Sequence, residues 1–252
     1  MLAGLATVVA VTIERAHGPL ATSGCRATSA VASYSITLEQ AQNAAIIAAV
    51  ALRKQMPDHA VTIALAASLQ EAQLRNLPYG DLDSVGLFQQ RPSQGWGTRA
   101  QVLDPNYAAS AFYDHLSLVS GWQTMPVTDA AQLVQHSAAP NAYAAWEGEA
   151  RSLASALTGE VAAGFSCRLN SFGGAAPPPA ALAQAAATEM GAQPLGVPVS
   201  TKAGWEAAAW AVAHAYNYHL SSVSFAGRRW TAASGTWAEA RPGTPANIVT
   251  VT

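Results

Sequence analysis

Apolar residues recur at helical spacing along the first part of the chain. Thr37 and Gln40 have the order of a capping box, and the apolar positions after them predict a helix to about Met56. Asp58 is a candidate cap for a second helix. That helix must end before Pro78, because proline disfavours helical backbone in the residue before it. The pattern therefore predicts two consecutive helices within residues 37–77.

The same spacing predicts more helices downstream. Their expected starts are the Asp104-Pro105 pair, Thr128, about Asn141 (for a helix to Leu157) and Thr201. Residues 79–97, between the second and third helices, are rich in Gly, Asp and Pro and predict turns with one or two short strands. Strand-like runs follow the last helix at 223–225, 229–231, 236–237 and 248–251.

These elements indicate an α+β fold that is mainly helical and divided into two parts. We expect a helical domain over residues 25–169 and a small Trp-rich α+β domain over 193–252. Residues 170–192 are rich in Pro and Ala and predict a linker with a short helix ended by Gly191. In the second domain we expect the tryptophans to fill a small core, although Gly227 to Trp230 could instead present cations and a ring to an anionic polymer.

Composition narrows the classes of function. Of the 252 residues, 50% are hydrophobic and 11% are charged, which excludes disorder driven by charge. The net charge of -2 provides no field for a polyanion, so we expect no nucleic-acid partner. The six histidines are scattered, and neither a P-loop nor a dinucleotide fingerprint occurs. We therefore expect no metal and no cofactor.

The N-terminal segment is apolar from Met1 to Ile13, and no Lys or Arg precedes this run. It falls short of the roughly 20 apolar residues that a membrane-spanning helix needs. We interpret residues 1–24 as the remnant of an export leader or as an anchor region at the membrane, with a buried strand as the alternative.

Cys25 and Cys167 are the two cysteines of the chain. A pair that brackets the helical part is typical of a single disulfide formed in an oxidising compartment. We therefore expect an extracytoplasmic protein, either secreted or held at the outer face of the membrane or in the cell wall. Two reduced thiols and a lipid-modified Cys25 are the alternatives.

Glu71 is the sole carboxylate in the run from Ala60 to Leu74, at the end of the second predicted helix. The negative end of the helix dipole and burial against apolar neighbours would both raise its pKa, which suits a general acid near neutral pH. The alternative is an ordinary surface ion pair with Arg75, four residues later, which would lower the pKa.

Three segments resemble the goose-type lysozyme and soluble lytic transglycosylase group. They are Gln70-Glu71 with the following Leu74 to Asn76 (LRN), the Ser84 to Gln89 run (SVGLFQ) and the Asn141 to Trp146 run (NAYAAW). The resemblance covers about residues 37–158, and the whole chain resembles secreted actinobacterial wall proteins in which a lysozyme-like unit precedes a small Trp-rich domain. It implies binding of peptidoglycan glycan strands and cleavage of their β-1,4 bonds, and we expect a monomer.

The resemblance also implies roles for single residues. Glu71 would be the general acid, Tyr143 would lie near it, and Gly86, Phe88 and Gln89 would line the saccharide groove. Trp96, in a Gly-rich loop, is a further candidate for stacking on a sugar.

Whether the reaction needs a second carboxylate is open. A transglycosylase of this group uses one Glu and forms a 1,6-anhydro sugar, whereas an inverting hydrolase needs a second carboxylate. Asp81 and Asp83 are the candidates for that second group, and their alternative role is to form turns.

Two other functions compete with cleavage. Ala72 stands where the group usually has Ser, which favours a non-catalytic protein that binds wall glycans. A structural protein that uses the Trp-rich part for a protein partner is the second alternative.

Overall fold

The computed structural model describes residues 22–137 and 141–252. The chain has the expected α+β fold, mainly helical with two small antiparallel sheets. The interpretation of residues 1–24 as a leader or anchor lies almost wholly outside the described residues. In the part that is described, no helix is long and apolar enough to cross a membrane.

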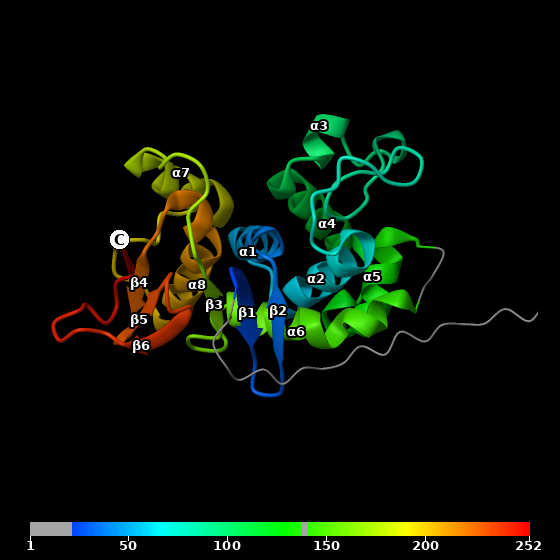
Figure 1. Ribbon diagram of the computed structural model, residues 1–252. Helices are drawn as coiled ribbons and strands as arrows, with labels where there is room; N and C mark the ends of the chain where they lie inside the picture. The colour runs from blue at the N-terminus through cyan, green and yellow to red at the C-terminus, as the bar shows by residue number, and fades with distance from the viewer. Residues whose placement is uncertain (1–21, 138–140) are drawn as a thin grey trace, which may run out of the picture.

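Helix α1 (Leu38–Arg53) lies in the middle of the molecule, with α2 and α4 on one side and α7 and α8 on the other (Figure 1). It begins with the expected capping box between Thr37 and Gln40. Most of its residues are buried, and Ala is the commonest of them. Small side chains let neighbouring helices approach α1 closely on both sides.

Helix α2 (Asp58–Ala72) is buried around most of its circumference. It packs against α1, α4 (Pro105–Leu118), α5 (Val127–Gln135), the 3₁₀ helix η3 (Ala142–Trp146) and α6 (Glu147–Leu157). The short α3 (Arg99–Val102) and the 3₁₀ helices η1 (Pro92–Gln94) and η2 (Trp122–Thr124) connect these elements. The interior position of α2 fixes the residues at its C-terminal end.

Three helix starts differ by one or two residues from the expectation. Pro57, Pro126 and Ser200 occupy the cap positions where Asp58, Thr128 and Thr201 were expected. Pro57 and Pro126 make no side-chain cap bond, whereas the Ser200 side chain accepts a bond from the backbone of Ala203. Asp104 caps α4 ahead of Pro105, as expected.

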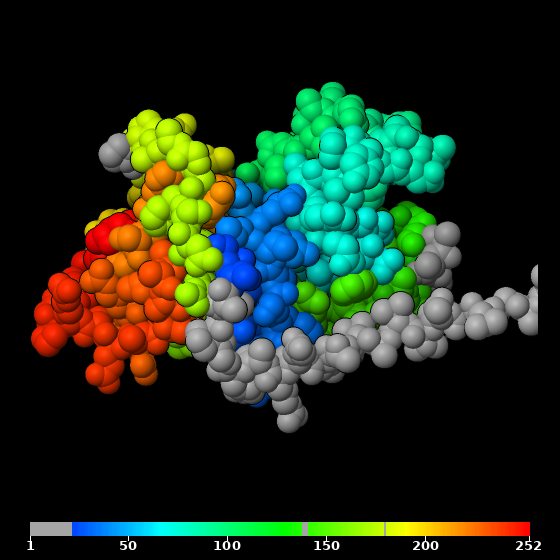
Figure 2. Space-filling model, in the orientation of Figure 1, coloured from blue at the N-terminus to red at the C-terminus, as the bar shows by residue number. Residues whose placement is uncertain are grey.

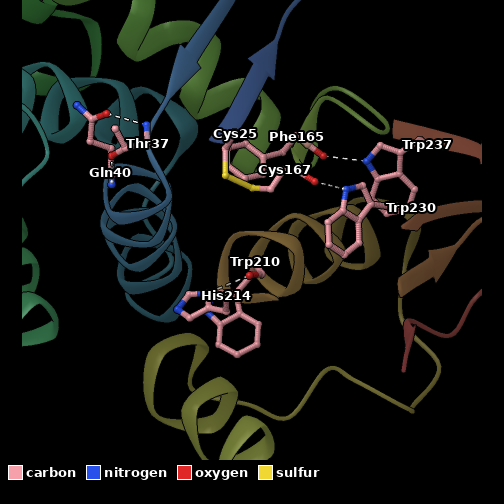
Figure 3. Close-up of a disulfide and its surroundings, with 9 residues drawn as sticks. All are labelled: Cys25, Thr37, Gln40, Phe165, Cys167, Trp210, His214, Trp230 and Trp237. Atoms are coloured by element: carbon pink, nitrogen blue, oxygen red, sulfur yellow. Dashed lines mark hydrogen bonds between the residues drawn. A yellow bond between two sulfur atoms is a disulfide. The ribbon is translucent and has the colours of Figure 1, made fainter. Parts of the chain in front are cut away.

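The first sheet was not expected from the sequence. It has the order β2–β1–β3 and consists of β1 (Gly24–Thr28), β2 (Ser33–Ile36) and β3 (Phe165–Arg168), all antiparallel. Cys25 lies directly opposite Cys167 in the register of β1 and β3, and the two form the expected disulfide (Figure 3). The disulfide and the sheet together join the start of the described chain to the end of its first predicted domain.

The second sheet has the order β6–β5–β4–β7 and is antiparallel throughout. Its strands are β4 (Ser222–Phe225), β5 (Arg228–Thr231), β6 (Thr236–Glu239) and β7 (Thr250–Val251), close to the expected runs. Helix α8 (Thr201–Tyr218) packs against β4. The expected short helix in the linker is α7 (Pro179–Met190), and Gly191 ends it.

The two expected domains share one hydrophobic core, which includes residues of α1, α2, α6, α8 and β4. The indole nitrogens of Trp230 and Trp237 donate to the carbonyl oxygens of Cys167 and Phe165, at 2.9 and 2.8 Å (Figure 3). Trp230 is fully buried, so its ring fills the core and is not presented to a polymer. In the space-filling view the C-terminal part lies directly against the rest of the molecule (Figure 2).

Candidate functional site

Glu71 is the next-to-last residue of α2, as the sequence predicts. The helix ends because Gln73 adopts a left-handed conformation, with φ of 53°, and its side chain donates back to the carbonyl of Leu69. Glu71 is only partly buried, so its carboxylate stands where a buried helix reaches the surface. This position at the negative end of the helix dipole disfavours the ionised carboxylate.

Tyr143 lies against this carboxylate. Its hydroxyl donates a hydrogen bond of 2.7 Å to Oε1 of Glu71. The tyrosine comes from η3, which packs against both α2 and α5, and its ring is fully buried. Burial, together with the neighbouring Glu71, raises the pKa of Tyr143, so the phenol keeps its proton and acts as the donor.

The pKa of Glu71 is raised above its ordinary value. Burial is the largest cause, and it outweighs the hydrogen bonds from Tyr143 and Gln135, which act in the opposite direction. The surface ion pair with Arg75 does not form, because α2 ends at Ala72 and Arg75 is exposed beyond it. The geometry therefore gives a carboxyl group that keeps its proton to higher pH than a free Glu side chain.

Side-chain hydrogen bonds hold the Ser84 to Gln90 segment against α2, the helix that ends with Glu71 and Ala72. The hydroxyl of Ser68 in α2 donates to the carbonyl of Leu87 at 3.0 Å, and Gln135 in α5 donates to the carbonyl of Phe88 at 2.9 Å. Gly86 has φ of +82°, and a Cβ at this position would lie 2.5 Å from the carbonyl oxygen of Val102. Glycine is needed here for the conformation and for the close approach.

The expected groove residues are not equally accessible. Phe88 is 1% exposed and stacks on Phe112 with ring centroids 4.8 Å apart, so its side chain belongs to the core. The expectation that Phe88 lines a groove is therefore wrong, and Gly86 is buried as well. Gln89 remains partly exposed, and its amide nitrogen contacts the carbonyls of Tyr79 and Gly86.

The carboxylate of Asp83 is bound by residues of its own loop. One oxygen pairs with Nε of Arg91 at 2.8 Å, and the other accepts from the backbone of Ser93 at 2.7 Å. The Arg91 hydrogen bond, followed by that of Ser93, lowers the pKa of Asp83 to about 2. Asp81 is exposed, and its carbonyl accepts from the backbone of Ser84 in a turn. The Asp83 side chain serves the loop conformation, which is the alternative that the sequence left open.

Trp96 packs against His115 of α4, with ring centroids 4.0 Å apart and planes at 27°. One face of the indole is thereby covered, and the ring is partly exposed. Tyr107 lies beside the same loop, since a Cβ on Gly97 would come within 2.6 Å of its hydroxyl.

One residue that contacts the carboxylate was not expected from the sequence, and a second contact forms at the neighbouring Gln70. Gln135 hydrogen-bonds to Glu71 from α5, and Trp146 donates from its indole nitrogen to Oε1 of Gln70 at 2.7 Å. Gln135 lies more than 60 residues from Glu71 along the chain, and no local pattern marks it, whereas Trp146 ends the run of residues 141–146. The adjacent Gln70-Glu71 pair is the signal that points to this corner of the fold.

Within residues 22–137 and 141–252, no three His, Cys, Asp or Glu side chains gather into a metal-binding group. What the arrangement offers is one carboxyl group with a raised pKa, a phenol that holds it in place and amide groups at its border. Such a group can give a proton to a leaving oxygen and take one back in a later step.

No protein-family model matches the chain, and no curated protein matches it in sequence.

Proposed function

We propose that the protein cleaves the β-1,4 glycosidic bonds of peptidoglycan glycan strands, with Glu71 as the general acid. The observation that carries the proposal is the contact between Glu71 and the buried hydroxyl of Tyr143 at the end of α2. The sequence resemblance led us to expect these two residues together, and they lie 72 positions apart in the chain.

In the proposed reaction, Glu71 gives its proton to the oxygen that bridges two sugars, and the bond from that oxygen to the anomeric carbon breaks. The resulting carboxylate then takes the proton of the sugar's own 6-hydroxyl as that oxygen attacks the anomeric carbon. The products are a 1,6-anhydro sugar and a shortened strand with a free hydroxyl, and Glu71 is protonated again. Tyr143 positions the carboxyl group through its hydrogen bond.

The state of Asp83 makes one of the two candidate second carboxylates unsuited to an inverting hydrolase. An inverting enzyme needs a second carboxylate, free to activate water. Asp83 is bound by Arg91 and Ser93, and the low pKa makes it a weak base. The single-carboxylate reaction requires no such partner.

The proposal also places the protein outside the cytoplasm, as a monomer at the cell wall where its substrate is. The Cys25–Cys167 disulfide is consistent with an oxidising compartment. Residues 1–24 would serve export or attachment at the membrane.

The route is tested by digesting purified peptidoglycan with the full chain in ¹⁸O-labelled water and measuring product masses. Attack by the 6-hydroxyl gives anhydro products without the label, whereas hydrolysis gives reducing ends that carry it. Unlabelled anhydro products support the proposed reaction. Labelled reducing ends would replace it with a hydrolase, and binding without any release would leave a glycan-binding protein.

A further inference from the structure

An open hollow lies at the surface where the ends of three helices meet. It is bordered by the start of α1, the residues that follow α2 and the last turn of α8. Its volume is about 790 Å³, within the roughly 300–1,000 Å³ of pockets that bind small molecules. The residues that line it include Ser23, Thr37, Glu39, Gln73, Arg75 and Tyr216.

The hollow begins next to the proposed catalytic carboxyl group, although Glu71 itself does not line it. Gln73 follows Glu71 by two positions, and two residues of chain span at most about 7 Å. The side-chain amide of Gln40, at the start of α1 (Figure 3), donates to the carbonyl of Gln73 at 3.0 Å. This bond holds the end of α2 against the start of α1. A substrate bound at Glu71 can therefore extend into the hollow.

Both predicted domains contribute to this hollow. Tyr216 comes from α8 in the C-terminal part and is half-buried, whereas the start of α1 and the end of α2 belong to the helical domain. Helix α8 packs against α1, and beside Tyr216 the side chain of Asn217 donates to Oε1 of Gln42 at 2.7 Å. The C-terminal part therefore supplies one wall of a site beside Glu71.

Uncharged polar groups of the wall have hydrogen-bonding capacity left for a ligand. The hydroxyls of Ser23 and Thr37 each accept a backbone hydrogen bond, and neither donates to any residue that the structure describes. Gln73 uses its amide nitrogen on the carbonyl of Leu69, and no residue of the described chain donates to its side-chain oxygen. The wall can therefore offer a ligand two donors and one acceptor.

One cation and one anion also line the hollow. Arg75 and Glu39 are exposed, and neither side chain forms an ion pair with the other or with any residue of 22–137 and 141–252. A neutral saccharide needs neither charge, whereas a short peptide with free carboxylates and an amine matches both signs. The peptide stems on the muramic acid residues of peptidoglycan have this chemistry.

We propose that the hollow binds the peptide stem of the strand whose bond Glu71 cleaves. Arg75 would bind a carboxylate of the stem, Glu39 its amine, and the side chain of Tyr216 would form the far wall. The inference rests on the proposed function, because the stem is part of the same substrate. It adds a preference for strands that carry stems over bare strands.

Two substrates that differ only in their stems test the proposal. One is soluble, uncrosslinked glycan with stems, and the other is the same material after an amidase has removed the stems. The full, disulfide-bonded chain digests each, and product release gives kcat and KM. We expect kcat/KM to be at least tenfold higher on strands with stems, mainly through a lower KM, because the stem adds binding away from the cleaved bond.

Arg75→Gln should remove most of that preference. We expect the ratio of kcat/KM between strands with and without stems to fall about tenfold in Arg75→Gln and about threefold in Glu39→Gln. Arg241→Gln is the matched control and should keep the ratio of the wild type. Arg241 is also exposed and forms no ion pair with the described residues, but it does not line this hollow.

Binding of a muramyl tetrapeptide, which has no β-1,4 bond to cleave, separates this proposal from the proposed function. Calorimetry should show binding to the wild type that Arg75→Gln weakens at least tenfold and that Arg241→Gln leaves intact.

Equal kcat/KM of the wild type on both substrates, or an unchanged ratio in Arg75→Gln, would overturn the stem site and leave glycan cleavage standing. Tetrapeptide binding that depends on Arg75, without cleavage of either substrate, would support the stem site and overturn cleavage by Glu71. The absence of both binding and cleavage would overturn both proposals.

Discussion

The proton on Glu71 depends on two opposing influences at the end of α2. Burial raises the pKa, and the hydrogen bonds from the hydroxyl of Tyr143, 2.7 Å away, and from Gln135 lower it. A general acid is most useful when its pKa lies near the working pH, so the tyrosine adjusts the acid as well as positioning it.

Removing that hydroxyl should therefore change the pH dependence of the reaction. We expect Tyr143→Phe to raise the pKa of Glu71 further, because the hydrogen bond favours the ionised form. The alkaline limb of kcat/KM should move to higher pH, and the maximum should fall by about tenfold through lost positioning.

Tyr113→Phe is the matched control, since Tyr113 is also buried and donates to the carbonyl of Ile47. It should lower stability and leave the pH profile in place. A Tyr143→Phe profile identical to that of the wild type would contradict the assigned role.

The raised pKa of Glu206 leads to a second prediction at the residue scale, about how the free energy of unfolding depends on pH. An unfolded Glu titrates near 4.5, whereas Glu206 in the fold titrates at about 7. Between these values the folded chain binds more protons than the unfolded chain, so the free energy of unfolding falls as pH rises through this window.

Glu206→Gln should remove that fall and be more stable than the wild type at pH 8, by on the order of 3 kcal/mol. Urea denaturation at pH 4, 6 and 8 measures the difference. Parallel curves for the two proteins would show that Glu206 titrates normally in the fold.

At the scale of elements, the helices follow local rules that the sequence displays. The Thr37 and Gln40 capping box and the Asp104-Pro105 start lie where they were expected. β1, β2 and β3 were missed because each is four or five residues long, and β1 pairs with β3 across more than 130 residues of sequence. The pattern of residues within a short segment does not predict pairing between strands so far apart in the sequence.

The start of α8 provides a test at this scale. The side chain of Ser200 makes the cap bond, and Thr201 is the first helical residue. Ser200→Ala should lower the free energy of unfolding by about 1 kcal/mol, because a backbone N–H loses its acceptor. Thr201→Ala, the control, should change it by less than about 0.5 kcal/mol. The urea midpoints of the two variants measure these losses of stability. A larger loss in Thr201→Ala than in Ser200→Ala would assign the cap to Thr201.

Some residues of the candidate site could be predicted from the sequence, and others could not. The helix boundary predicted Glu71 at a helix end, and the resemblance implied that Tyr143 lies near it. The burial of Phe88 could not be predicted from the sequence. It depends on Phe112 of α4, which lies beside Phe88 only in the folded chain. Gln135 carries no local signal for the same reason.

At the scale of the whole molecule, the sequence predicts two domains joined by the Pro/Ala-rich stretch, and residues of both parts belong to one hydrophobic core. Composition identified the stretch without revealing that α7 packs against α1 or that Trp230 bonds to the backbone of β3. Lys202 of α8 also pairs with Asp58 of α2. These contacts link the stability of the two parts.

The shared core predicts that the oxidised chain unfolds in a single transition. Calorimetry should give one peak, and tryptophan fluorescence and far-UV circular dichroism should give coincident midpoints in urea. Trp230→Phe should lower the single midpoint without splitting it, because the loss of the indole N–H removes a bond between the parts. Two separate transitions would show that the parts fold independently.

The central claim is that Glu71 supplies the proton for glycan cleavage, and one comparison tests it most directly. Purified peptidoglycan is digested with the wild type, with Glu71→Gln and with Glu206→Gln, and soluble muropeptides are quantified by mass spectrometry. Glu206→Gln is the control because it also removes a carboxyl group whose pKa is raised by burial.

Glutamine keeps the shape of Glu71 but has no proton to donate. We expect the wild type and Glu206→Gln to release 1,6-anhydro products at similar rates, and Glu71→Gln to be slower by at least 100-fold. Equal release by Glu71→Gln and the wild type would contradict the account.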